Sequence, residues 1–173
     1  MIALSLSIML GSAVSQKAEK VAFSFNGAQY VHRYTKDNLH EYTPKGKPDL
    51  KSWTDMVTIN DYPSVKTGED LAKSANSVLE TYKEHKAVVV RTDSVPKTPK
   101  KEAEHLIVVM FTTPSFIETA FARFVIADGY GHSVVYSHRV YGKKAGDAMS
   151  AWLLTHGEKS EKALMAMPTV PKR

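Results

Sequence analysis

The chain has 173 residues, no cysteine and a formal net charge of +5 at neutral pH. This length predicts one domain that buries a sizeable core without cross-links. The absence of cysteine excludes a disulfide scaffold, a zinc-thiolate site, an iron-sulfur cluster and a thiol nucleophile. With 43% hydrophobic and 24% charged residues, the chain is predicted to be neither disordered nor embedded in a membrane.

The first 15 residues have the pattern of a secretory signal peptide. No side chain before Lys17 is charged, and the apolar run over 2–10 is too short to span a membrane. Ala13 and Ser15 place small residues three and one before a cleavage point. We predict a signal peptide at 1–15, a domain at 16–167 and a tail at 168–173. The alternative is a buried N-terminal strand or helix.

Export without disulfides fits a bacterial periplasmic protein better than a small secreted eukaryotic one, because small secreted domains are usually rich in disulfides. The sequence contains no Asn-x-Ser/Thr site, so nothing indicates a glycosylated secretory protein. We therefore expect the periplasm of a Gram-negative bacterium as the location, and no transmembrane span in the mature chain.

The first half of the domain is predicted to form a strand meander followed by a helix. Residues of high β propensity alternate with turn sequences such as Asn26-Gly27, which predicts strands over 21–25, 28–35, 39–43 and 53–59. Thr67 and Asp70 then form a helix start, and apolar residues recur at helical spacing over 68–86. We expect this amphipathic helix to cover a sheet.

The second half is predicted to contain long antiparallel strands and a closing helix. Strands are expected over 87–92, 106–111, 116–127 and 132–141, with a mobile loop or an irregular edge over 93–104. The apolar run at 106–111 predicts a central strand buried on both faces. A helix over 144–155 is expected to end at Gly157, and 158–167 is expected to add at most a further helical turn or two. The fold class is α+β, a single-domain sandwich with a mainly antiparallel sheet of about six to eight strands and two principal helices.

This order of elements over residues 20–167 resembles that of the PsbP-like α/β/α sandwiches. That group includes photosystem extrinsic proteins and small bacterial envelope proteins. The segment Trp53-Thr54-Asp55-Met56-Val57-Thr58, together with Tyr136-Ser137-His138-Arg139, resembles exported bacterial proteins of unknown function. Neither resemblance implies a functional residue.

Motifs of the common enzyme classes are missing. There is no Walker loop and no G-x-S-x-G elbow, and Pro44 stands where H-E-x-x-H would need a second histidine after His40. The seven histidines have no metal-ligand spacing, so we expect no metal site and no cofactor. His32 and His138, each inside a Tyr/His/Arg strand, are suited to a shared role if their strands are neighbours.

The long hairpin allows its cross-strand pairs to be predicted. A four-residue turn at 128–131 pairs Ala127 with His132. This register gives three further pairs, Phe121 with His138, Arg123 with Tyr136, and Ala120 with Arg139. Glu118 is then diagonal to Arg139, where we expect a charged pair. Because successive strand residues point to opposite faces, His138 and Arg139 are expected on different faces.

The leading functional hypothesis is a non-enzymatic exported protein that binds an envelope protein or a small ligand. Eighteen acidic residues are spread among 23 basic ones without a nucleic-acid motif, so nucleic acid is not an expected partner. Tyr, Trp and Arg supply contact area and directional hydrogen bonds on a sheet face or cleft edge left open by the helices. The candidate surface residues are Tyr30, His32, Trp53, Arg123, Tyr136, His138 and Arg139.

Two alternatives remain. One is a periplasmic hydrolase or metal-dependent enzyme that uses His32, His40, His132 or His138. It predicts a pocket in which two imidazoles and a carboxylate converge. The other is a structural envelope component with no pocket and one broad apolar patch.

Overall fold

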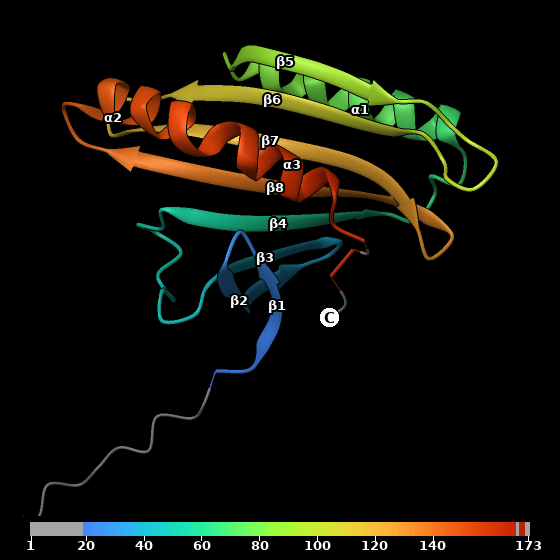
Figure 1. Ribbon diagram of the computed structural model, residues 1–173, viewed down its shortest axis with the longest axis horizontal. Coiled ribbons are helices and arrows are strands. Elements are labelled where there is room, and N and C mark those ends of the chain that lie inside the picture. Colours follow the sequence, from blue (N-terminus) through green and yellow to red (C-terminus); the bar gives the residue numbers. More distant parts are fainter. Residues whose placement is uncertain (1–18, 169, 172–173) are drawn as a thin grey trace, which may run out of the picture.

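The computed structural model describes residues 19–168, 170 and 171. The predicted signal peptide at 1–15 and part of the predicted tail lie outside these residues. Eight strands form one antiparallel sheet in the order β1-β2-β3-β4-β8-β7-β6-β5 (Figure 1). The strands are β1 (Val21–Phe25), β2 (Ala28–Lys36), β3 (Leu39–Pro44), β4 (Asp55–Tyr62), β5 (Val88–Val95), β6 (Glu104–Thr112), β7 (Phe116–Ala127) and β8 (Tyr130–Tyr141).

The sheet consists of two meanders joined side by side. β1 to β4 pair in chain order, and so do β5 to β8. β4 then pairs with β8, from Asp55 opposite His138 to Tyr62 opposite Gly131. β1 and β5 are therefore the two edges, and β8 lies inside the sheet. The α+β class and the antiparallel sheet predicted from the sequence are confirmed.

Helices cover both faces of the sheet. On the first face, called the α1 face, α1 (Gly68–Glu84) buries Leu71 in a cluster with Val109 of β6. The opposite face, called the α3 face, carries a continuous rod of α2 (Ala145–Trp152), the π-helix η1 (Leu153–Gly157) and α3 (Glu158–Met165) (Figure 1). Leu164 of α3 is buried there in a cluster with Phe121. Within the part of the chain that is described, no helix is long and apolar enough to cross a membrane.

The predicted start of α1 is confirmed, but the predicted end of the last helix is wrong. Thr67 Oγ1 accepts a hydrogen bond from the Asp70 backbone N–H, which satisfies one free donor of the first turn. Gly157 has φ −56° and ψ −57°, which are helical values, so the helix does not end there, and the chain continues as α3 over the segment where a further turn or two was expected. A glycine that caps a helix adopts a left-handed conformation instead. Burial of Leu164 in the α3-face core favours the continued helix.

Two predictions about the strands after α1 also need correction. β6 is buried on both faces, as predicted, because it contributes to the cores under both helical layers. It is not central, since only β5 separates it from the sheet edge. β5 runs to Val95, so the start of the segment 93–104, predicted to be a mobile loop or an irregular edge, belongs to the edge strand, and Asp93 there pairs with Leu106. The partner strand extends β5 beyond what its local sequence indicates.

The turn of the long hairpin has two residues and not four. Asp128 and Gly129 both have positive φ, 49° and 84°, as a type I′ turn requires. Ala127 therefore pairs with Tyr130, which shifts the predicted register by two residues. The predicted pairs are replaced by Phe121 with Tyr136, Arg123 with Val134, and Ala120 with Ser137. Glu118 lies directly opposite Arg139, and the expected charged pair forms with a distance of 2.7 Å from Nε to the carboxylate.

Candidate functional site

The seven candidate surface residues do not lie together. Strand alternation places five of them on the α3 face, namely Tyr30, His32, Arg123, Tyr136 and His138. Arg139 points to the α1 face, as predicted from its position next to His138, and Trp53 stacks on it. Tyr30, Trp53, Arg123 and Tyr136 are buried, contrary to the prediction that they lie on a surface. A single surface made of all seven residues is therefore absent.

Arg123 forms a buried ion pair with a structural role. Its Nε and Nη2 donate to the two carboxylate oxygens of Glu104 at 2.8 and 2.9 Å. Its Nη1 donates to the carbonyl oxygens of Leu164 and Met167. Burial raises the pKa of Glu104, but hydrogen bonds from Arg123 and Lys101 outweigh it, and the pKa lies below its ordinary value. Arg123 thus ties β6 and β7 to the end of α3.

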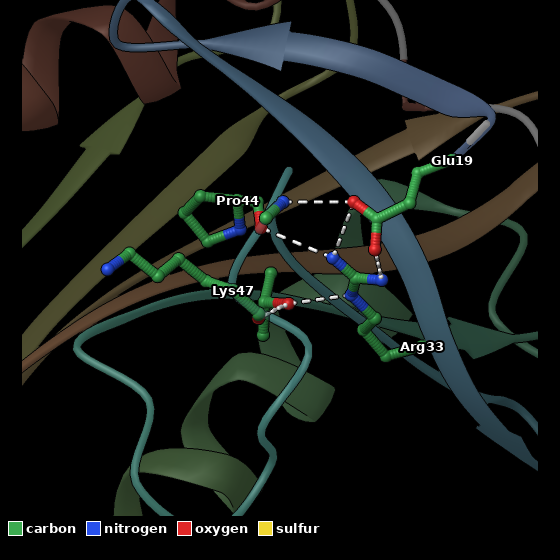
Figure 2. A network of polar contacts seen from close by, with 6 residues as sticks. Glu19, Arg33, Pro44 and Lys47 are labelled. Carbon is green, nitrogen blue, oxygen red and sulfur yellow. Dashed lines mark hydrogen bonds and ion pairs between the residues drawn. The ribbon is translucent and has the colours of Figure 1, made fainter. Parts of the chain in front are cut away.

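Arg33 on β2 is engaged in the same way. Figure 2 shows its guanidinium between Glu19 and the start of the loop that follows β3. Nε donates to Thr43 Oγ1 at 2.8 Å, and Nη1 donates to Glu19 at 2.6 Å (Figure 2). The Gly46 backbone N–H also donates to Glu19, and the hydrogen bond from Arg33 is the main cause that lowers the pKa of this carboxyl. Arg33 therefore anchors the start of the described chain to the meander.

Asp55, at the start of β4, joins two candidate residues on the α3 face. Its Oδ1 accepts the Tyr136 hydroxyl at 2.7 Å and lies 2.9 Å from His138 Nδ1. Burial raises the pKa of Asp55, but the hydrogen bonds from His138 and Tyr136 bring it below its ordinary value. The His138 ring stacks on Trp152 with 4.0 Å between centroids, and Trp152 also stacks with His156 of η1. The adjoining cavity, about 210 Å³, is smaller than most ligand sites.

A second polar chain on the α3 face contains three other histidines. Thr35 Oγ1 lies 2.7 Å from His32 Nε2 and 2.8 Å from His40 Nδ1. Asp61 then lies between His40, at 3.5 Å, and His132, at 2.8 Å. Two imidazoles and a carboxylate therefore converge beside a cavity of about 230 Å³, as the enzyme alternative predicted.

His132 in this polar chain has no ring nitrogen available to a substrate. His132 Nδ1 faces Asp61 and its Nε2 faces the Ala127 carbonyl oxygen at 3.2 Å, so neither ring nitrogen is left to exchange a proton with a ligand. Burial is the main cause that lowers the pKa of His132. Across 19–168, 170 and 171, no three His, Asp or Glu side chains are placed to hold a metal ion. His32 and His138 do not meet, because β3 and β4 separate their strands.

An open groove lies on the α1 face where α1 leaves the sheet uncovered. Its volume of about 580 Å³ is within the range of small-molecule sites. Residues of β3, β4, β6, β7, β8 and the end of α1 line it. The lining combines aromatic rings, hydroxyl groups and one guanidinium, supplied by Tyr82, Phe111, Phe116, Thr58, Ser137 and Arg139. We call this hollow the Arg139 groove.

Arg139 is clamped at the end of this groove. Its guanidinium carbon lies 3.8 Å from the centre of the Trp53 ring and 4.1 Å from that of Phe116. Nε donates to Glu118 at 2.7 Å, while no described residue accepts a hydrogen bond from either Nη group. The Tyr141 hydroxyl donates to the Trp53 carbonyl oxygen and so fixes the segment that carries the indole. The side chain is rigid, and two of its three nitrogens keep their donors.

Sequence reasoning missed Asp55 and Asp61, which join the histidines and Tyr136. Both lie at ends of β4, where aspartate usually belongs to a solvated turn. The pairing of β4 with β8, distant in sequence, brings them to the imidazoles. The one available signal was their spacing of two with Val57 and Ile59, which places all four on a single face.

No protein-family model matches the sequence, and the search of curated proteins gave no match. Among solved structures, the chain is similar to the Saccharomyces cerevisiae Ran-binding protein Mog1p, with a TM-score of 0.49, 10% identity, and 86% of this chain and 93% of that chain covered. A mutant of Mog1 has a TM-score of 0.44 and 8% identity, with 86% of this chain and 93% of that chain covered. Human STARD10 has a TM-score of 0.33 and 9% identity, with 80% of this chain and 74% of that chain covered. Ran binding is stated for the yeast protein and is not transferred to this chain.

Proposed function

We propose that this protein is a non-enzymatic binding module and that the Arg139 groove is its site. The observation that carries the proposal is the clamped Arg139 side chain, whose free Nη groups border a hollow of ligand size. Stacking between Trp53 and Phe116 fixes the guanidinium before a ligand arrives, so little side-chain entropy is lost on binding. Glu118 takes only Nε and leaves the N–H donors of both Nη groups to the ligand.

The lining defines the chemistry of the ligand. A guanidinium recognises carboxylate and carbonyl oxygens through paired N–H donors. The rings of Tyr82 and Phe111 offer an apolar wall, and Thr58 and Ser137 offer hydroxyl groups. We therefore expect a small ligand with a carboxylate beside an apolar or aromatic body. Because Glu118 neutralises the charge of Arg139, recognition depends on hydrogen bonds and shape more than on long-range attraction.

The two tryptophans allow a direct test by fluorine NMR. Labelling with 5-fluorotryptophan gives one resonance for Trp53, which contacts Arg139, and one for Trp152, which lies on the opposite face. We expect a library of small aromatic and aliphatic carboxylates to contain binders that shift the Trp53 resonance and leave that of Trp152 in place. If no member shifts the Trp53 resonance, the groove is not the site.

Substitution of the guanidinium gives the matched comparison. Arg139→Gln should weaken such a ligand by at least about tenfold, because a hydrogen bond to a charged group contributes roughly 1.5–3 kcal/mol. Lys143→Gln removes the same charge from an exposed position outside the groove and should leave the affinity unchanged. Equal affinities for the Arg139→Gln variant and the parent protein would contradict the proposal.

We also propose that the protein acts in the envelope of a Gram-negative bacterium. The support is the uncharged apolar run and the small residues Ala13 and Ser15 in the first 15 positions. The resemblance to the PsbP-like group, which includes envelope proteins, belongs to the same proposal. N-terminal sequencing of the exported protein should give Gln16 as the first residue, and retention of Met1 would refute cleavage.

A further inference from the structure

The edge strand β5 is exposed along its whole length. Every residue from Val88 to Val95 is exposed, including Val88 at 57% and Val90 at 53%. β5 pairs only with β6, so its other side presents unpaired backbone N–H and C=O groups. An eight-residue strand with exposed valines and a free backbone edge is a template for a further strand.

The opposite edge of the sheet is built differently. β1 has five residues, an irregularity between Val21 and Phe23, and a buried terminal Phe25. The Glu19–Arg33 ion pair also holds the chain in front of it. Short, irregular edges discourage pairing with another chain. β5 has one irregularity, between Val89 and Arg91, but from Arg91 to Val95 it pairs regularly with β6.

We propose that β5 pairs in antiparallel fashion with β5 of a second copy of this chain, centred on Thr92. The sequence of the strand is self-complementary in this register alone. Arg91 and Asp93 are placed symmetrically about Thr92 and point to the same face, so Arg91 of each copy lies opposite Asp93 of the other. Within one copy Arg91 Nη2 already contacts Asp93 at 2.9 Å and Glu161 of α3 at 3.1 Å, so the dimer adds a second Asp93 to an existing cluster of charges. A register shifted by one residue puts Arg91 opposite Ser94, and a register centred on Asp93 puts two carboxylates opposite each other.

The geometry of this pairing produces a closed dimer. Because the twofold axis through Thr92 is perpendicular to the sheet, the two sheets join into one with the same helical layer on each face. Antiparallel pairing places the segment 88–90 of one copy alongside Val95 of the other, whose direct partner by count from Thr92 is Val89, and so removes exposed valines from water. Such a contact uses the same patch on both copies and leaves no free β5 edge. No residue of β5 lines the Arg139 groove, although β6 beside it contributes Phe111, so the dimer does not depend on the groove.

Because the chain has no cysteine, a single introduced cysteine can form a disulfide only with the same residue of a second copy. In the proposed register Thr92 lies opposite itself, with a Cα–Cα distance of about 5 Å, which a disulfide spans. The Thr92→Cys variant should therefore form a covalent dimer under mild oxidation. Ser94→Cys is the matched control on the same strand, since its two copies lie about 13 Å apart along the strands and should not cross-link. Equal cross-linking of the two variants would overturn the register.

Charge substitution tests the pairing without a cross-link. Sedimentation velocity from micromolar to near-millimolar protein should show a monomer–dimer equilibrium for the parent chain. Asp93→Arg puts like charges opposite each other twice and should weaken the dimer by at least about tenfold. Adding Arg91→Asp together with Glu161→Gln to that variant exchanges the two charges without setting a new carboxylate against Glu161, which lies 3.1 Å from Arg91, and should restore the dimer.

The controls separate a failed interface from a failed fold. Glu80→Arg makes the same change of charge on the exposed surface of α1 and should leave the equilibrium as it is. Circular dichroism confirms that each variant is folded. A parent chain that stays monomeric throughout, or a dimer that Asp93→Arg does not weaken, overturns the proposal and leaves the β5 edge to a strand of another protein.

Discussion

The buried ion pair of Glu104 and Arg123 gives the sharpest stability prediction. Glu104 is 1% exposed and Arg123 is 5% exposed, and two parallel hydrogen bonds of 2.8 and 2.9 Å join them. Glu104→Gln keeps the shape of the side chain but removes the charge, which leaves the guanidinium buried without its counter-ion. Breaking such a pair costs about 3–5 kcal/mol of unfolding free energy. For a chain of this size that corresponds to a fall in Tm of roughly 6–20 °C.

Urea unfolding followed by circular dichroism measures this change as a shift of the midpoint at constant slope. Glu80→Gln is the matched control, because the Glu80–Lys83 pair is exposed and contributes less than about 1 kcal/mol. The double variant Glu104→Met/Arg123→Met should be less destabilised than the sum of the single variants, since it leaves no unpaired buried charge. A loss below about 1 kcal/mol for Glu104→Gln would refute the reasoning.

Three further predictions concern a helix cap, a close approach and pH. Thr67→Ala removes the acceptor for the Asp70 N–H and should cost about 1 kcal/mol in the same urea assay, whereas Thr67→Ser should cost little. Gly131→Ala places a Cβ 2.6 Å from Val65 Cγ1, so calorimetry should show a lower Tm, and an unchanged Tm would mean that the Val65 segment yields easily. The pKa of Glu104 is lowered in the folded state, so its stabilising effect is complete above the unfolded value near 4.3 and is lost as pH falls through the folded value. The Glu104→Gln variant should therefore lose less stability than the parent chain between about pH 5 and about pH 3, and parallel losses would exclude this carboxyl as a cause.

Local signals in the sequence were sufficient for most elements. The strand at 116–127 has the predicted bounds, because alternating β-branched and aromatic residues between turn signals favour one backbone conformation. The amphipathic helix after Thr67 starts at the predicted residue for the same kind of reason, a cap followed by helical spacing. Gly157 shows the limit of such signals, because burial of Leu164 outweighs the usual preference of glycine for a helix end.

Only part of the candidate site was predicted from the sequence. Trp53 and Arg139 were named, and the hairpin predicted the contact of Arg139 with Glu118 although the register was wrong by two residues. The clamp also needs Phe116, and its partner Trp53 is separated from Arg139 by about half of the chain. Residue type alone does not tell a clamped surface arginine from a buried one, and Arg123 was placed in the same surface group although Glu104 neutralises it in the core.

The sequence by itself determined a cysteine-free α+β chain, the type of nearly every element, and the separation of His138 and Arg139 onto opposite faces. These properties depend on backbone preferences and on spacing between near neighbours. Only the tertiary structure decided that β4 pairs with β8, which brings Asp55 to His138 and Asp61 to His132 and opens the Arg139 groove beside α1. The order of the strands depends on which apolar faces are buried together across the whole chain. Because the hydrophobic effect is non-directional, the local sequence of a strand does not specify which distant strand it pairs with.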